Sequence, residues 1–310
     1  MKPDRTLVQS LSWWWNTRIK SWWSVKLPAA RVAASMAVKQ ANNPHSGLHF
    51  EKTADELPAA SEQTVTAILT VYKRGQYLSA QIDALKNQSV PPDEIWVWCN
   101  SSDTDIQDYS AIADRVVVSN TNWKFWGRFA MANMARTQYV CLFDDDILPQ
   151  PNWIKNCLDT FKGGIHGILG GSGVILPVKG GYSSKHKVGW NGHHYNEVTQ
   201  VDLVGHAWFF DKRLLRFMWE EPPHSWENGE DIHFSAMVLK HGGLGTYVPP
   251  HPENDHSLWS CRPDFGKAVG RESSATFKST GHHNVRDHIV DSLRANGWKL
   301  VAQQHEKDNP

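Results

Sequence analysis

The sequence lacks three features that would place it in other classes of protein. No apolar run approaches the roughly 20 residues needed to cross a bilayer, and the N-terminal tryptophans are interrupted by charged and polar residues, unlike a secretory signal. Its 32 basic side chains are balanced by 32 acidic ones, which argues against a nucleic-acid binder. None of the four cysteines has the C-x-x-C spacing of a zinc site. We expect buried, reduced thiols and a cytoplasmic protein.

Tryptophan, by contrast, is abundant, with 16 residues. Its flat apolar face and single N–H donor suit stacking on sugar rings, placement at a membrane interface, or packing in a core. We name Trp190, Trp208 and Trp226 as candidates for stacking on a sugar-containing ligand, whether it gives or receives the sugar. Trp208 falls within an expected strand, so core packing is the alternative for it.

The first 62 residues form an expected N-terminal extension with a composition of their own. Seven lysines and arginines oppose only Asp4 in the first forty residues, and leucines and tryptophans recur there at roughly helical spacing. A basic, tryptophan-rich helix over residues 5–35 can lie peripherally on a membrane, or it can pack on the catalytic domain or on another copy of the chain. Asparagine, proline and glycine over residues 41–63 predict a linker.

Residues 63–310 show an alternation of strand and helix patterns. The expected strands have apolar or β-branched runs and the expected helices have helical periodicity, giving strands over 65–72, 94–99, 115–118, 139–143, 165–169 and 201–210, and helices over 77–87, 127–137, 152–161, 230–240 and 285–296. This order predicts an α/β domain with a mostly parallel central sheet and helices on both faces. The glycine-rich stretch 163–173 lacks the spacing of a phosphate-binding loop, so we assign it to turns around a strand.

The strongest functional signal is Asp144-Asp145-Asp146, directly after the apolar run YVCLF. In open α/β sheets, ligands bind at the carboxyl ends of the strands. Three consecutive carboxylates repel one another there, and a cation would offset that cost. An all-oxygen ligand set suits Mn²⁺ or Mg²⁺, which can also bridge a diphosphate. A solvated acidic turn is the alternative.

Two further motifs accompany the three aspartates. Glu230 and Asp231 begin an expected helix, where they can serve either as catalytic carboxylates or as complements of the helix dipole. Arg128, in Trp126-Gly127-Arg128-Phe129, can clamp a phosphate or form a surface salt bridge. Among the 16 histidines, His256 and His282 follow the acidic pair and are candidate metal ligands.

The segments AILTVYKRGQYLSAQIDAL, EIWVWCNSSD, GRFAMANMARTQYVCLFDDD, VDLVGHAWFF and NGEDIHF follow the order typical of GT-A glycosyltransferases. The resemblance covers roughly residues 65–243. Within it the sequence is similar to two branches of these enzymes, family two and the exostosin-like enzymes. Asn100 stands where family two usually has an aspartate, so the match is somewhat closer to the exostosin-like branch. Family-two enzymes invert the anomeric centre and exostosin-like enzymes retain it, which leaves the stereochemistry open.

The resemblance also implies roles for individual residues. Thr70, Asn100 and Arg128 would contact the nucleotide, Asp144 and Asp145 would lie near the ribose and the metal, and Asp146 would ligate the metal. Glu230 or Asp231 would be catalytic. The expected reaction is transfer of a hexosyl or N-acetylhexosaminyl group from a UDP-sugar, with Mn²⁺ or Mg²⁺, to a hydroxyl of a glycan, lipid-linked or polymeric acceptor.

Two other functions stay open at this point. A nucleotidyltransferase of similar topology also uses metal-binding carboxylates, although it usually has a glycine-rich basic loop where this chain offers only Lys73, Arg74 and Gly75. A non-catalytic carbohydrate- or membrane-binding protein with a degenerate domain is the other alternative, and the intact acidic motifs argue against it. The sequence leaves the sugar, the acceptor and a homo-oligomeric state open.

Overall fold

The computed structural model describes residues 63–101, 109–190, 193–269 and 281–304. The chain divides into two compact units, Met1–Ala59 and Ala60–Pro310, and the fold described here is that of the second. The predicted helix over residues 5–35 and nearly all of the predicted linker lie outside the described residues. Within those residues, no helix is long and apolar enough to span a membrane.

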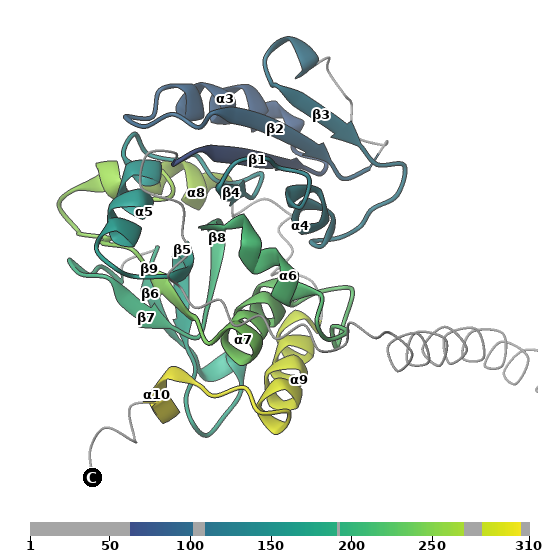
Figure 1. Ribbon diagram of the computed structural model, residues 1–310, viewed down its shortest axis with the longest axis vertical. Helices are drawn as coiled ribbons and strands as arrows, with labels where there is room; N and C mark the ends of the chain where they lie inside the picture. Colours follow the sequence, from purple (N-terminus) through teal and green to yellow (C-terminus); the bar gives the residue numbers. More distant parts are fainter. Residues whose placement is uncertain (1–62, 102–108, 191–192, 270–280, 305–310) are drawn as a thin grey trace, which may run out of the picture. The chain divides into compact units, whose positions relative to one another are not determined.

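One nine-stranded sheet forms the centre of this unit, and its first half is parallel (Figure 1). The strands β3 (Arg115–Val118), β2 (Glu94–Cys99), β1 (Val65–Val71) and β4 (Tyr139–Phe143) lie side by side in that order. All three pairings between them are parallel. Their predicted positions are confirmed to within one residue, because strands buried on both faces form continuous apolar runs.

The second half of the sheet is mixed. β8 (Leu203–Asp211) is antiparallel to β4 and to β5 (Gly167–Ile175). β9 (Gly245–Val248) is parallel to β5, whereas β6 (His186–Gly189) and β7 (Thr199–Val201) make antiparallel pairs with β5 and β9. The expectation of a mostly parallel sheet therefore holds for the first half only. Between β5 and β8 the described chain contains no crossover α-helix, which a parallel neighbour would need.

The predicted strand over 201–210 is two strands, interrupted at Asp202. The Asp202 carboxylate accepts hydrogen bonds from the backbone N–H of Leu176 at 2.6 Å and of Val301 at 2.7 Å. These bonds tie the bend to the end of β5 and to the last described helix. β7 and β8 consequently pair with different strands.

Helices cover both faces of the sheet, as predicted. One core cluster lies under α4 (Gly127–Ala132), α6 (Leu215–Met218), α7 (Glu230–Gly242) and α9 (His282–Ala295), and the other under α3 (Leu78–Lys86) and α5 (Trp153–Lys162). The remaining helices are α8 (Pro263–Val269), α10 (Val301–Gln304) and the 3-10 turns Gly75–Tyr77, Tyr109–Ala111, Tyr182–Ser184, Lys212–Leu214 and His256–Leu258. The helix predicted over 127–137 ends earlier, at Ala132.

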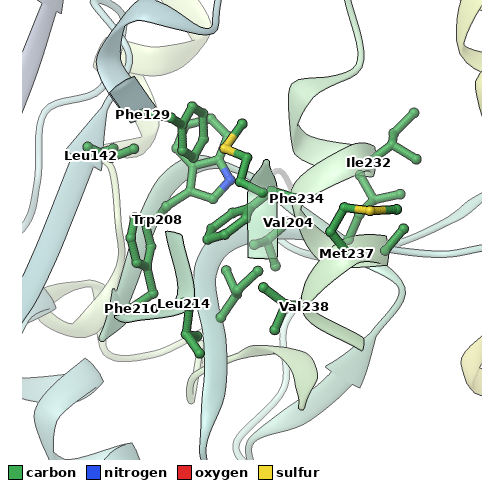
Figure 2. Close-up of a cluster of buried hydrophobic side chains, with 14 of the residues drawn as sticks. Phe129, Leu142, Val204, Trp208, Phe210, Leu214, Ile232, Phe234, Met237 and Val238 are labelled. Atoms are coloured by element: carbon green, nitrogen blue, oxygen red, sulfur yellow. The ribbon is translucent and has the colours of Figure 1, made fainter. Parts of the chain in front are cut away.

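An aromatic core fixes α7 against the sheet (Figure 2). Side chains alternate along a strand, so Trp208 and Phe210 of β8 face this cluster. The Phe234 ring of α7 lies 5.0 Å from Phe210 and 5.4 Å from Phe129 of α4. This packing sets the position of the N-terminus of α7, where Glu230 and Asp231 lie.

Candidate functional site

A cavity of about 710 Å³ opens at the carboxyl ends of the parallel strands. Thr70 lies near the end of β1, Asn100 follows β2, and the three aspartates follow β4. The first turn of α7 lines the same cavity. The structure thus brings together eight of the residues predicted for the site, namely Thr70, Asn100, Arg128, Asp144, Asp145, Asp146, Glu230 and Asp231.

Arg74 holds the second and third aspartates. This arginine lies in the turn after β1, forms an ion pair with Asp145, and its Nη2 lies 3.6 Å from the Asp146 carboxylate. Burial raises the pKa of Asp145 to about 7, although Arg74 acts in the opposite direction. Burial and the charge of Asp144 also raise the pKa of Asp146. The three carboxylates therefore carry an electrostatic cost that a cation would lower.

Arg128 joins the two acidic motifs. Its guanidinium pairs with Asp144 and, at 3.0 Å, with Glu230, and it stacks over the Trp208 ring at 4.5 Å. The side chain is only 3% exposed, so the alternative of a surface salt bridge is wrong. Removing this cation would leave two carboxylates without their shared partner.

The acidic pair at the start of α7 has its own cation, Arg286 of α9. Arg286 lies 2.5 Å from the Asp231 carboxylate and donates to the Asn228 side chain at 3.0 Å. Gly229 precedes the pair at φ +91°, and a Cβ there would lie 2.4 Å from Ile289 of α9. The turn therefore requires glycine both for its backbone conformation and for the close approach of α9.

The pKa of the Glu230 carboxyl lies near neutral pH. Burial, with a further contribution from the charge of Asp231, raises the pKa of Glu230 to about 7, and Arg128 opposes the shift. A carboxylate with such a pKa can accept a proton near neutral pH. Because the two carboxylates are adjacent, proton uptake belongs to the pair rather than to one residue.

Among the cavity-wall residues that sequence reasoning did not assign to the site are Arg74, Tyr182, His206 and Arg286. Arg286 has a recognisable signal, because it shares the apolar stripe of α9 with Ile289, Val290 and Leu293 at helical spacing. His206 follows a glycine inside a strand, a pattern that often marks a bulge. Its φ is +71°, and the register between β5 and β8 shifts opposite it.

The two histidines predicted as metal ligands do not join this site. His256 is exposed and packs against Trp259 with a ring-centroid distance of 4.2 Å, away from the cavity lining. The side chain of His282 lies outside what the structure describes. Among the described residues, no three His, Cys, Asp or Glu side chains are arranged to hold one metal ion.

The residues present nevertheless fit a divalent cation bound together with a diphosphate. Asp144 and Asp146 have side chains that are 29% and 24% exposed toward the cavity. Five carboxylates in the lining are paired with three guanidinium groups, which leaves a surplus of acid. Mg²⁺ characteristically takes one or two carboxylates and completes its octahedron with phosphate oxygens and water.

Several buried polar atoms in the lining have no hydrogen-bond partner. They are Thr70 Oγ1, Arg74 Nη1, Arg128 Nε, His206 Nδ1, Trp208 Nε1 and Arg286 Nε. Buried polar groups are normally satisfied, and exceptions require an explanation. Most of these atoms are donors, which matches a ligand rich in acceptor oxygens.

The fold and the site together define a class. A parallel half-sheet, an acidic turn after its central strand and a cavity at the strand ends form the GT-A arrangement. Residues 66–218 match the model for glycosyl transferase family 2. This segment, slightly under half of the chain, resembles family two, and together with the fold it supports a GT-A glycosyltransferase.

Solved structures of S. aureus TarS are similar to this chain. TarS 1-349, crystallised alone and in complex with UDP, shows 15% identity over 60% of each chain, with a TM-score of 0.44. A further TarS structure shows 16% identity over 60% of this chain and 36% of that chain, with a TM-score of 0.43. This chain thus spans less than two thirds of each TarS chain. No curated protein sequence matches it.

Proposed function

We propose that the protein transfers a hexosyl or N-acetylhexosaminyl group from a nucleotide-diphosphate sugar to an acceptor hydroxyl, with the help of Mn²⁺ or Mg²⁺. The observation that carries the proposal is the single cavity that gathers Asp144–Asp146 and Glu230–Asp231 around unsatisfied buried donors. UDP is the nucleotide we expect, from the resemblance of the sequence to GT-A enzymes. The acceptor is a carbohydrate or a glycosylated molecule.

In this proposal the parallel half of the sheet binds the donor. Thr70 and Asn100 contact the nucleotide, and Asp144 and Asp146 hold the cation together with the diphosphate. When bound there, Mn²⁺ or Mg²⁺ would supply positive charge to neutralise the leaving diphosphate. Arg74 and Arg128 already lie beside these carboxylates, so their guanidinium groups can turn part of their hydrogen bonding toward phosphate oxygens.

The pair Glu230–Asp231 supplies the chemistry at the acceptor. Because the matched family is family two, we propose inversion, in which a carboxylate of this pair takes the proton of the attacking hydroxyl. Arg286 and Arg128 fix the orientation of the two carboxylates. Nucleotidyl transfer, the alternative, has no supporting observation. The sequence matches a glycosyl transferase family, and Arg74 of the short basic loop is paired with Asp145.

A thermal-shift screen tests the proposal. The full chain is scanned with UDP, GDP, CDP, ADP and dTDP, with and without Mn²⁺, and the same is done for Asp146→Asn. Ligand binding at about a hundredfold excess over Kd adds about 2.7 kcal/mol to stability. We expect a metal-dependent shift with one nucleotide that Asp146→Asn loses. If none of the nucleotides raised the unfolding temperature, the proposal would be overturned.

A further inference from the structure

Two exposed tryptophans share one buried partner beside the cavity. Trp226 is 58% exposed and Trp219 is 40% exposed. Both rings pack against the buried Trp126, with centroid distances of 5.0 Å for Trp226 and 6.2 Å for Trp219. The Trp126 indole N–H also donates to the backbone oxygen of Trp226 at 3.0 Å. The exposed indoles are therefore fixed in orientation by a buried support.

This indole cluster of Trp126, Trp219 and Trp226 is continuous with the cavity wall. Lys124 and Phe125 precede Trp126 in the chain, Glu227 and Asn228 follow Trp226, and all four line the cavity. The Lys124 ammonium lies 2.9 Å from the Glu227 carboxylate and joins the two segments. The indoles thus lie at the rim of the cavity, a few residues before Glu230 and Asp231.

The charges around the indoles select among the ligands that tryptophan can bind. The segment from Trp219 to Glu227 contains three glutamates and no lysine or arginine. The lysines that contact this segment are already paired, Lys240 with Glu221 at 2.6 Å and Lys124 with Glu227. Anionic membranes and polyanions are attracted by unpaired Lys and Arg, so this surface favours a neutral ligand.

A neutral sugar ring can stack on the exposed indoles and also carries no charge for the glutamates to repel. The C–H groups on one face of a pyranose ring stack on the apolar face of an indole. Its hydroxyl groups can donate to the carboxylates beside the indoles, and hydrogen bonds to ionised acceptors are the stronger kind. The matched family segment ends at residue 218, directly before Trp219, so the two exposed indoles lie outside the part of the chain that the family model describes.

We propose that Trp219 and Trp226 form a stacking platform for the sugar rings of a neutral glycan acceptor at the mouth of the donor cavity. The inference rests on the proposed transferase function, since it names the acceptor class of that reaction. Trp226 is the principal residue because it is the more exposed and lies nearer in sequence to the acidic pair.

Direct binding of neutral oligosaccharides tests the platform. Maltotetraose, cellotetraose and tetra-N-acetylchitotetraose are titrated calorimetrically into the full chain, with and without UDP and Mn²⁺. The same titrations use Trp226→Ala, Trp219→Ala and, as a matched control, Trp123→Ala, which removes an indole that is 57% exposed and lies outside the cluster. We expect one oligosaccharide to bind, with affinity reduced about tenfold in Trp226→Ala, less in Trp219→Ala, and unchanged in Trp123→Ala.

Two other measurements separate this inference from its alternatives. The metal-dependent nucleotide shift should persist in Trp226→Ala, so that failure of the platform is distinguishable from failure of donor binding. Co-sedimentation with vesicles of phosphatidylcholine and phosphatidylglycerol tests a membrane ligand instead. Wild-type protein that binds none of the oligosaccharides, a Trp226→Ala variant that binds them equally well, or vesicle binding that requires Trp226 would each overturn the proposal.

Discussion

The two halves of the sheet differ in architecture and in what they contribute to the cavity. The parallel half ends in Thr70, Asn100 and the three aspartates, and its strands are continuous apolar runs. The mixed half carries α7 and α9, which deliver the acidic pair and Arg286. Under the proposed function, the first half would bind the donor and the second half would provide the acceptor chemistry. Arg128, bound to carboxylates of both halves, connects the two.

The largest effect should come from the acidic pair of the mixed half. Glu230→Gln and Asp231→Asn each remove a candidate proton acceptor while keeping the size of the side chain. We expect the variant that removes the base to lower turnover about 10²–10⁴-fold, with UDP affinity in Mn²⁺ close to the wild-type value. Release of nucleoside diphosphate from the nucleotide sugar measures turnover.

Glu253→Gln is the matched control, since Glu253 is an exposed glutamate outside both the cavity lining and the indole cluster. It should turn over at the wild-type rate. Full activity in both Glu230→Gln and Asp231→Asn would contradict the assignment of catalysis to this half.

The next effect concerns the residue that joins the halves. Arg128→Met leaves the buried Glu230 and the partly exposed Asp144 without their cation, and loss of one partner of a buried pair costs about 3–5 kcal/mol. Urea unfolding should show this loss. Arg213→Met is the control, because Arg213 is 48% exposed and pairs with Asp211 at 2.7 Å; it should cost at most about 1 kcal/mol. Equal losses in the two variants would contradict a junction role for Arg128.

The third effect is a pH dependence at the bend between β7 and β8. Burial raises the pKa of Asp202 from 3.8 to about 6. Its contribution to stability is therefore complete below pH 3.8 and is lost as the pH rises through about 6. The difference corresponds to about 3 kcal/mol. Between pH 4 and pH 8 the unfolding free energy of wild type should therefore drop more than that of Asp202→Asn, by up to about 3 kcal/mol. The same drop in both proteins would refute this role of Asp202.

The smallest effect tests the close packing of β5 in the mixed half. A Cβ at Gly170 would lie 2.4 Å from Val204 Cβ, whereas a Cβ at Gly205 meets nothing within 4 Å. Gly170→Ala should therefore cost about 1–3 kcal/mol through overpacking, and Gly205→Ala should change the unfolding free energy little. Two equal thermal unfolding midpoints would show that the strands can separate to accept the methyl group.

Local pattern predicted the parallel half well and the mixed half poorly, for physical reasons. β1, β2 and β4 are buried on both faces and need no information beyond their own residues. β5 was predicted too short because it contains glycines, which have low strand propensity but are required by close neighbours such as Val204 and Ser260. The break at Asp202 depends on Leu176 and Val301, which are distant in sequence.

The candidate site shows the same limit. The three aspartates and the acidic pair stand out because each follows or begins a regular element. Two of their three cations do not stand out, because Arg74 lies in a turn and Arg286 lies in a helix beyond the family match. Only the position of Arg286 on an apolar stripe marks it before the fold is known.

The measurement that tests the division of labour most directly is calorimetric titration of UDP into wild type, Asp146→Asn and Glu230→Gln, with Mn²⁺ and with EDTA. The account predicts metal-dependent binding by wild type and by Glu230→Gln, and loss of that binding in Asp146→Asn. Binding that survives in Asp146→Asn, or that ignores the metal, would contradict it.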